Sequence, residues 1–302
     1  MKRIAIQFFG HLRTFDKTYE SFLKNVISVN IVDGYQIDVF IHTWTERSHS
    51  TVSFRNPNGE SVSNSLLTKD LIEKAKKIYQ PKIFLIDDQI DCQDHIFYER
   101  LYKSKKSLKG VINMTYTIHR SSYARHVYER ERQIKYDWVI VTRPDIEFLS
   151  PLRLDELLKV YIDNDVAIPV NSIFYATKIF ARAKINDVRF VGGSDLIYFG
   201  KPEDIDKATN LYDYWLKENG CSDLIWYEDF YSPESWLIRY WERQKLKPVE
   251  IDYVTNRDFY PKFNGTKLSF KNLFFKLKKI FFDVIKYILP YKLIVWLIEK
   301  NN

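Results

Sequence analysis

Short apolar segments alternate with longer helix-like segments along the first 260 residues, and this alternation constrains the fold more than any other feature. Parallel strands need a long crossover connection, usually a helix, so this order predicts an α/β domain with a mainly parallel sheet and helices on both faces. The expected strands are Ile4–Phe9, Ile37–His42, Lys82–Ile86, Trp138–Thr142, Val166–Val170 and Pro248–Val254, with a further short one in VGGSDLIYFG. The expected helices are Tyr19–Val29, Thr68–Tyr79, Asn113–Gln133, Leu154–Tyr161, Pro202–Asn219 and Pro233–Gln244.

The excess positive charge of the chain lies in its C-terminal end. The whole chain of 302 residues carries a net charge of +7, and the segment from Lys262 to Asn302 holds nine Lys, no Arg and only two acids. The remainder is therefore balanced, and its length suits one large domain. We expect a domain over residues 1–260 and a separate basic tail over residues 261–302.

The tail has the pattern of an amphipathic helix. Its aromatic and aliphatic residues recur at helical spacing with lysines between them, and Pro290 ends the pattern. This combination is typical of a helix that lies in the interface of an anionic membrane. The alternative is a C-terminal helix docked on the domain. The residues that define the apolar stripe are Leu273, Leu277, Ile280, Phe281, Val284 and Ile288.

Several sequence features favour a cytoplasmic protein that is peripheral on the inner face of the cytoplasmic membrane. The two cysteines, Cys92 and Cys221, have no metal-ligand spacing and suggest a reducing compartment. The apolar run near the N-terminus is too short for a signal peptide, and no stretch of 18 uncharged apolar residues occurs. A nucleic-acid partner is not expected, because the body is charge-balanced and no binding motif appears.

Common catalytic motifs are missing from the sequence. No GxxxxGK[ST] or GxGxxG pattern occurs, so neither a P-loop nor a dinucleotide-binding fingerprint is expected. No GxSxG or HExxH pattern occurs, and the six histidines do not cluster. Serine and zinc hydrolysis therefore have no support.

The strongest signal for chemistry is YDWVIVTRPDIEFLSPL, where an apolar strand runs directly into charged residues. Alternation places Arg143, Asp145 and Glu147 on one face for as long as the chain stays extended. Two carboxylates with one spacer can hold Mn²⁺ or Mg²⁺ against a diphosphate, and an adjacent arginine can pair with phosphate. The alternative is a solvated loop in which Arg143 pairs with Asp145.

Four segments resemble, in the same order, bacterial surface-polysaccharide (LPS and capsule) glycosyltransferases with a GT-A-like fold: FFGHLRTF, DVFIHTW, IYQPKIFLID and YDWVIVTRPDIEF. The resemblance covers residues 1–260. Asp145 falls on the second Asp of the GT-A Asp-x-Asp motif, and Arg143 replaces the first. The resemblance implies a GT-A-like, Rossmann-type sheet and a nucleotide-sugar donor. It leaves open whether a divalent metal binds at Asp145 and Glu147 or whether Arg143 supplies part of the ion's charge.

The resemblance also implies that the first strand and its loop hold the nucleotide, which points to Phe9, Gly10 and Arg13. The residue types agree, because glycine lets a ligand approach the backbone and arginine pairs with phosphate. The alternative for Arg13 is the start of a surface helix. His42, at the carboxyl end of the second strand, is a further site candidate or else a buried, hydrogen-bonded histidine.

VGGSDLIYFG resembles the acceptor-side strand of GT-A enzymes, where small residues line the donor sugar. Gly192 and Gly193 then permit close approach, and Asp195 hydrogen-bonds sugar hydroxyls. The alternative is a turn in which Asp195 caps backbone amides.

The resemblance implies that YEDFYSPESWLIRYW supplies the acid for glycosyl transfer, which needs a carboxylate near the anomeric carbon or the acceptor hydroxyl. In several GT-A families this acid lies just before or within a late helix, so Glu234 is the first candidate and Asp229 the second. The alternative for Glu234 is stabilisation of the helix N-terminus.

Taken with the tail, these features predict a glycosyltransferase that moves a sugar from a nucleotide-sugar to a lipid-linked or surface glycan. Two alternatives remain open: a phosphotransferase that modifies the same glycans, and a non-catalytic membrane-bound scaffold of polysaccharide assembly.

Overall fold

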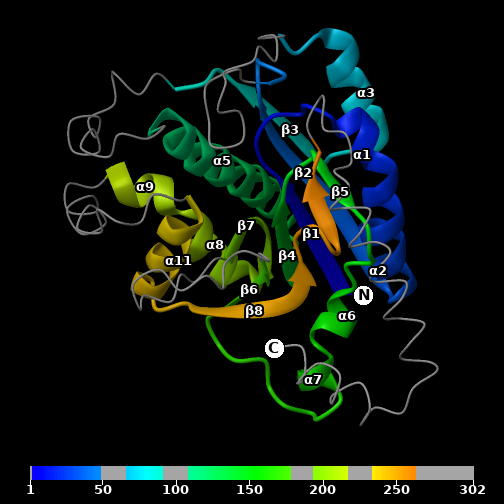
Figure 1. Ribbon diagram of the computed structural model, residues 1–302, viewed down its shortest axis with the longest axis vertical. Coiled ribbons are helices and arrows are strands. Elements are labelled where there is room, and N and C mark those ends of the chain that lie inside the picture. The colour runs from blue at the N-terminus through cyan, green and yellow to red at the C-terminus, as the bar shows by residue number, and fades with distance from the viewer. Residues whose placement is uncertain (1, 49–65, 91–107, 178–192, 217–232, 263–302) are drawn as a thin grey trace, which may run out of the picture.

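The computed structural model describes residues 2–48, 66–90, 108–177, 193–216 and 233–262. It confirms an α/β architecture in which a seven-stranded, mostly parallel mixed sheet is flanked by helices (Figure 1). The basic tail lies outside the described residues, apart from its first two positions. Among the described residues, no helix is both long and apolar enough to cross a membrane.

The large sheet has the strand order β3-β2-β1-β4-β7-β6-β8. Strand β1 pairs in parallel with β2 on one side and with β4 on the other, and β2 pairs in parallel with β3. Strand β7 is antiparallel to both β4 and β6, while β8 is parallel to β6. The strands are β1 (Lys2–Phe8), β2 (Tyr35–Trp44), β3 (Ile83–Asp87), β4 (Trp138–Thr142), β6 (Ser172–Thr177), β7 (Gly193–Gly200) and β8 (Lys247–Val254).

Helices cover both faces of this sheet. One face carries α1 (Phe15–Phe22), a π-helical turn over Leu23–Ser28, α2 (Val29–Val32) and α3 (Lys69–Tyr79), together with a small sheet of β5 (Ile146–Phe148) and β9 (Phe259–Pro261) (Figure 1). The other face carries α5 (Leu108–Arg132), α8 (Pro202–Thr209), α9 (Leu211–Leu216) and α11 (Pro233–Arg243). Two short helices, α6 (Leu154–Leu157) and α7 (Lys159–Ile162), follow β5.

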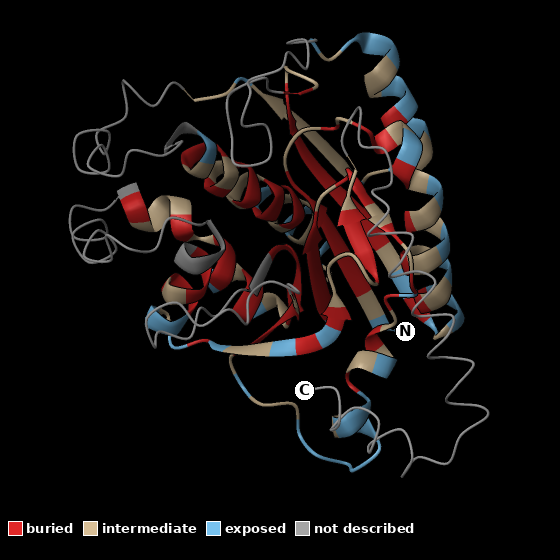
Figure 2. Ribbon diagram, viewed as in Figure 1, coloured by how far each residue is buried: buried red, intermediate tan, exposed pale blue. Residues whose placement is uncertain are grey.

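The apolar pattern of β1 explains this layering. Ile4, Ile6 and Phe8 pack in the core under α1 and α3, whereas Ala5 packs in the core under α5. Successive side chains of a strand point to opposite faces, so a strand with helices on both sides must be apolar at nearly every position. Figure 2 shows that the central strands are almost entirely buried.

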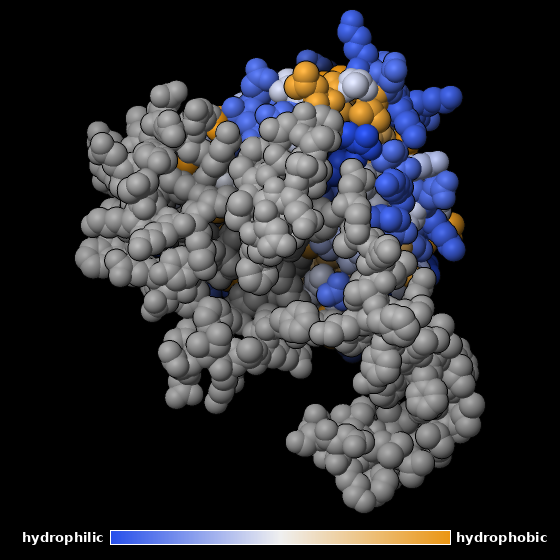
Figure 3. All heavy atoms as spheres, turned by 45° about the horizontal axis from the view of Figure 1, so that its top comes forward, coloured by the Kyte–Doolittle hydropathy of each residue, from blue (hydrophilic) through white to orange (hydrophobic). Residues whose placement is uncertain are grey.

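In contrast to the apolar central strands, α3 exposes one side to solvent. Thr68 caps this helix by accepting the N–H of Leu71, and Gln80, with a φ of 43°, ends it before Pro81. Its outward side chains are mostly Lys, Glu and Asp, and Figure 3 shows hydrophilic side chains over this part of the surface. The start and the end of this helix match the sequence prediction.

One predicted strand is wrong. Val166–Val170 forms no strand, and the exposed fractions of Val166 and Val170 are 53% and 77%. Pro169 cannot donate to a ladder, and Asn171 has a φ of 63°, which interrupts the extended backbone. Strand β6 begins only at Ser172.

Two predicted helices are interrupted. The segment expected to be continuous over Leu154–Tyr161 divides at Leu158 into α6 and α7. The helix expected from Pro202 divides at Asn210 into α8 and α9.

Asn30 joins α2 to the chain that follows β5. Its Nδ2 donates to the carbonyl oxygens of Val26 (2.7 Å) and Leu152 (2.8 Å), and its Oδ1 accepts the N–H of Leu154 (3.0 Å). Because Asn30 is buried, Asn30→Ala leaves these backbone groups unsatisfied, and we expect a loss of about 2–4 kcal/mol in the free energy of unfolding, measured in urea.

Asn164→Ala is the matched control. Asn164 is exposed and its Nδ2 bonds the carbonyl oxygen of Val160 at 2.8 Å, so water can replace the lost partner. The expected loss is below about 0.5 kcal/mol. Equal losses in the two variants would show that Asn30 does not link these elements.

Candidate functional site

The carboxyl ends of β1 and β4 meet where the strand order reverses. From β1 the chain proceeds to β2 and β3 on one side, and it then crosses through α5 to β4 on the other side. Ligands of open α/β sheets bind in the crevice outside the strand ends at such a point. The residues that follow β1 and β4 therefore form the candidate site.

The loop after β1 turns sharply at Gly10. The N–H of the buried Phe9 still donates to the carbonyl oxygen of Thr142 (3.1 Å), which continues the β1–β4 ladder by one residue. Gly10 then has a φ of +92°, a conformation in which other residues are strained. This turn brings the next residues of the loop across the end of β4.

Arg13 and Arg143 converge on the carboxylate of Asp145. Nη1 of Arg13 donates to Oδ2 of Asp145 at 3.0 Å. Arg143 binds the same carboxylate with two bonds, from Nε to Oδ1 (2.9 Å) and from Nη2 to Oδ2 (2.5 Å). Asp145 has no exposed surface, whereas the side chains of Arg13 and Arg143 remain 25% and 15% exposed.

The two arginines stabilise the charged form of Asp145. Burial alone would raise the pKa of this carboxyl, but the charges and hydrogen bonds of Arg143 and Arg13 outweigh burial and lower the pKa below its usual value. Asp145 is therefore an anion at neutral pH, held between two cations. The pairing of Arg143 with Asp145 was the alternative considered from the sequence, but the loop around it is buried and not solvated.

Glu147 is separated from this group by a turn. The extended backbone of β4 ends at Thr142, and a turn at Pro144 and Asp145 precedes β5. The expectation that alternation aligns Glu147 with Arg143 and Asp145 therefore fails at this turn. The carboxylate of Glu147 instead pairs with Nζ of Lys262 at 2.7 Å.

Lys262 lies immediately after β9 and fixes the chain beside the candidate site. Its N–H donates to the carbonyl oxygen of Asp145 at 2.7 Å, and its carbonyl oxygen accepts a hydrogen bond from the hydroxyl of Thr14. The end of the described chain is thus attached to the loops after both β1 and β4.

A further arginine, Arg47, supports the unusual backbone of Arg13. Arg13 has a φ of 36°, its N–H donates to the carbonyl oxygen of Arg47 (3.0 Å), and Nε of Arg47 donates to the carbonyl oxygen of Arg13 (2.8 Å). Nη2 of Arg47 also pairs with Asp16 at 3.2 Å. No sequence motif marks Arg47, so its position could not be predicted from the sequence.

His42 belongs to a buried hydrogen-bond chain. The N–H of Gly10 donates to Oγ1 of Thr117 (2.9 Å), and this hydroxyl lies 2.6 Å from Nδ1 of His42. Nε2 of His42 lies 3.1 Å from Oδ2 of Asp87. The contacts fit a neutral imidazole that accepts from Thr117 and donates to Asp87. His42 thus has the surroundings of a buried, hydrogen-bonded histidine.

Asp87, at the end of β3, is the centre of this chain. Its Oδ2 also accepts hydrogen bonds from Nε of Arg120 (2.7 Å) and from the hydroxyl of Tyr116 (2.9 Å). Together with Thr117, these α5 residues connect the carboxyl ends of β1, β2 and β3. The acidic end of the predicted third strand was a signal for Asp87, but no sequence pattern indicated its partners on α5.

Asp195 reaches the same edge from β7. Because β7 is antiparallel to β4, with Ile197 opposite Thr142, its first residues lie beyond the carboxyl end of β4. Asp195 is 8% exposed. Burial lowers the pKa of Arg143, but the charge and hydrogen bonds of Asp145, and to a smaller extent the charge of Asp195, outweigh burial and raise it above its usual value. Gly193 begins this strand, opposite Thr177 of β6.

The structure leaves the two proposed catalytic acids undefined. Glu234 is in the first turn of α11, but its side chain lies outside the described residues. Asp229 lies entirely outside them, as does Gly192.

The donor set at the end of β4 does not fit a divalent metal. A hard cation needs several oxygen ligands, whereas the carboxylates of Asp145 and Glu147 are each occupied by a different positive side chain. In the part of the chain that the structure describes, no group of three or more His, Cys, Asp or Glu residues could hold a metal ion.

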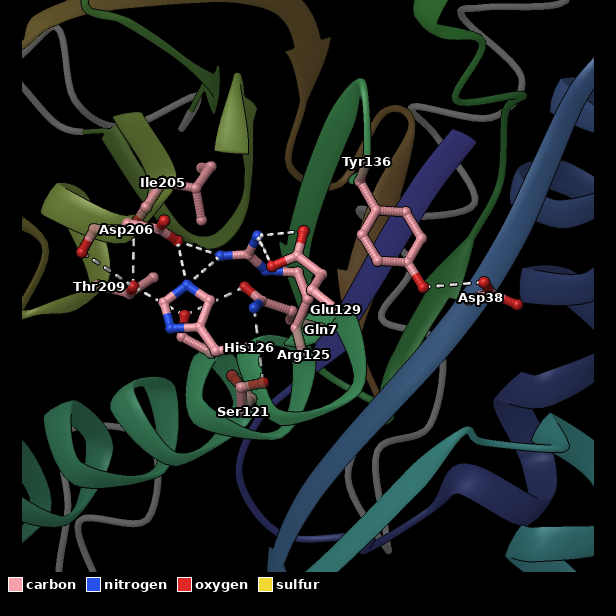
Figure 4. Close-up of polar contacts among 11 residues, drawn as sticks. Gln7, Asp38, Ser121, Arg125, His126, Glu129, Tyr136, Ile205, Asp206 and Thr209 are labelled. Carbon is pink, nitrogen blue, oxygen red and sulfur yellow. Dashed lines mark hydrogen bonds and ion pairs between the residues drawn. The ribbon is translucent and has the colours of Figure 1, made fainter. Parts of the chain in front are cut away.

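A second charged cluster lies at the amino edge of the sheet, between α5 and α8 (Figure 4). Buried Arg125 donates to both carboxylate oxygens of Glu129 at 3.0 Å and pairs with Asp206, whose Oδ1 lies 2.8 Å from Nε2 of His126. These residues line an open cleft of about 650 Å³, together with Tyr136. The cleft is lined by three positive side chains (Arg125, Arg130 and Lys135) and three negative ones (Glu129, Glu203 and Asp206), so it presents no excess charge.

No protein-family model matches this chain, and no curated protein is recognisably similar to it in sequence. The functional argument therefore depends on the site and on the sequence patterns described above.

The hydroxyl of Thr117 offers a direct test of the hydrogen-bond chain. Thr117→Val keeps the side-chain shape but leaves the N–H of Gly10 and Nδ1 of His42 without their partner. We expect a loss of about 2–4 kcal/mol in the free energy of unfolding. Thr115→Val is the control on the same helix, because among the described residues that buried hydroxyl bonds only the carbonyl oxygen of Ile112. The loss in this variant should stay below about 1 kcal/mol. Similar losses of stability in the two variants would show that Thr117 does not belong to a hydrogen-bond chain.

His42 also makes stability depend on pH. Burial lowers the pKa of His42 from 6.5 to about 4, which the charge of Asp87 offsets only in part. Between these two pKa values, the unfolded chain binds a proton at His42 that the folded chain excludes. The contribution of His42 to the free energy of unfolding is therefore complete above about pH 6.5 and falls by about 3 kcal/mol as the pH decreases toward 4.

Urea unfolding of the wild type and of His42→Gln at several pH values between 7.5 and 4 measures this contribution. Glutamine retains a donor toward Asp87 but does not titrate. The difference between the two proteins should shrink as the pH falls, and a constant difference would show that His42 protonates as easily in the folded state.

Proposed function

We propose that the protein is a nucleotide-sugar-dependent glycosyltransferase with a GT-A-like fold. It would transfer a sugar to a lipid-linked or surface glycan in the biosynthesis of a cell-surface polysaccharide such as LPS or capsule. The observation that carries this proposal is the position of Arg13 and Arg143, which converge where the strand order of a Rossmann-like sheet reverses.

The donor diphosphate is assigned to the carboxyl ends of β1 and β4. Gly10 keeps the backbone accessible there, and guanidinium groups bind phosphate oxygens with paired hydrogen bonds. In sugar transfer, negative charge develops on the departing nucleoside diphosphate as the bond to the anomeric carbon breaks. Fixed cations at that point stabilise the transition state more than the ground state.

The sugar itself is assigned to the side of β7. Asp195 is near enough to Arg143 for its charge to act on that side chain, and its carboxylate is proposed to accept hydrogen bonds from sugar hydroxyls while the arginine contacts the adjoining phosphate. Glu234 is the proposed group that assists attack by the acceptor hydroxyl, with Asp229 as the second choice. This assignment derives from the resemblance to GT-A families.

The acceptor class derives from the basic tail. A segment of aromatic residues and lysines binds anionic membranes, and it would hold the enzyme where lipid-linked glycans are found.

The first test is a melting-temperature screen of the full chain with UDP, GDP, CMP and their sugar conjugates. A nucleotide that binds the folded state raises the melting temperature. The nucleotide sugar that gives a shift is then incubated with the protein, and the released nucleotide is identified. Release of the nucleoside diphosphate from a UDP- or GDP-sugar supports sugar transfer, whereas release of the monophosphate indicates a phosphotransferase. No shift with any nucleotide favours a scaffold.

Arg13→Gln should weaken binding of that nucleotide by about 10- to 100-fold, because one charge-assisted hydrogen bond to phosphate is lost. Arg153→Gln is the control: Arg153 also pairs with a carboxylate, that of Asp33, but at the amino edge of the sheet. The affinity of Arg153→Gln for the nucleotide should match that of the wild type. Equal effects of the two substitutions would exclude Arg13 from the nucleotide site.

A further inference from the structure

Every carboxylate oxygen of Asp145 is already engaged by a guanidinium group. Oδ1 accepts from Arg143, and Oδ2 accepts from both Arg143 and Arg13, at distances of 2.5 to 3.0 Å. The aspartate that would bind the metal in a GT-A site is therefore the centre of a compact ion cluster.

Oδ2 accepts two guanidinium bonds and Oδ1 accepts one, so a divalent cation at Asp145 would displace an arginine or lie directly beside both. Asp145 has no exposed surface, so the displaced guanidinium and the ion would be two positive groups in a poorly hydrated region. Charges are strongly disfavoured in such a region unless they are paired. Glu147, the other expected ligand, is bound to Lys262 and separated from Asp145 by a turn.

We propose that the donor diphosphate is bound by the guanidinium groups of Arg13 and Arg143 without a bridging divalent cation. This inference rests on the proposed function, and it adds that the site replaces the metal of a GT-A enzyme with fixed positive side chains.

The geometry of Arg143 supports this arrangement. Its Nε and Nη2 bind Asp145, whereas its Nη1 forms no hydrogen bond with any residue that the structure describes. The side chain retains 15% exposure, so this remaining edge is available to a ligand in the crevice. Asp145 orients the guanidinium plane through two bonds, as a carboxylate commonly does in paired recognition.

Arg13 contributes from a different loop. It belongs to the loop after β1, whereas Arg143 follows β4, yet both reach Oδ2 of the same carboxylate. With Asp145 as their shared counterion, the three side chains retain one positive charge. Two planar donors on different loops can contact both phosphates of a nucleoside diphosphate, which a metal ion would otherwise bridge.

The decisive experiment compares nucleotide affinity with and without metal. The full chain is titrated calorimetrically with UDP and with GDP, first in excess EDTA and then in saturating Mn²⁺ or Mg²⁺. We expect the nucleotide that binds to have dissociation constants that differ by less than about threefold between the two conditions, which is less than about 0.7 kcal/mol. Affinity that is at least tenfold higher with metal would overturn this inference and leave the proposed function intact. Failure of both nucleotides to bind in either condition would refute the proposed function and this inference with it.

The variant Arg143→Gln separates phosphate binding from other contacts. In EDTA it should weaken binding of the nucleoside diphosphate by about tenfold or more, while the affinity for the matching nucleoside, which has no phosphate, stays unchanged. Arg153→Gln again serves as the control. An unchanged affinity for the diphosphate in Arg143→Gln would contradict the assignment. If this variant does not fold, the comparison between EDTA and metal in the wild type still decides the question.

Discussion

A carboxylate without exposed surface has to be compensated by its surroundings, and the compensation of Asp145 determines how the candidate site is built. One counterion comes from the same turn and the other from the loop after β1, so the two loops are joined by charge as well as by the strand ladder. Arg13 accepts an uncommon backbone conformation to reach this position, and Arg47 supports it. The neighbouring ends of β1, β2 and β3 are connected through α5 by an uncharged imidazole and its partners.

The two groups of polar residues at the carboxyl ends of the strands, one around His42 and one around Asp145, have different roles. Around His42 and Asp87, polar groups satisfy one another and hold the strand ends in register. Around Asp145, the arginines satisfy the carboxylate but keep part of their own surface exposed. Rigid support on one side and accessible charge on the other is what a preorganised phosphate site requires, because a ligand then meets donors that need no rearrangement.

The sequence predicted the features that depend on local pattern. Strand β4 and helix α3 were placed within one residue of their observed limits, because a buried parallel strand is apolar throughout and a capped helix marks both of its ends. The prediction failed where a few residues outweigh the pattern. Pro169 and Asn171 displaced the expected fifth strand, and the turn at Pro144 removed Glu147 from the charged group. Long-range partners such as Arg47 and Thr117 could not be found, since the pairing depends on the fold and not on spacing.

The attachment of Lys262 has a consequence for how the protein would meet its acceptor. Its backbone is hydrogen-bonded to Thr14 and to Asp145, so the described part of the chain ends beside the arginines of the candidate site. Under the proposed function, an acceptor held by the predicted tail would be tethered to the domain beside the proposed donor site. Its local concentration is then set by the reach of the tether and not by its abundance in solution, and for short flexible linkers such concentrations are in the millimolar range. A weak acceptor site could therefore be sufficient for efficient turnover.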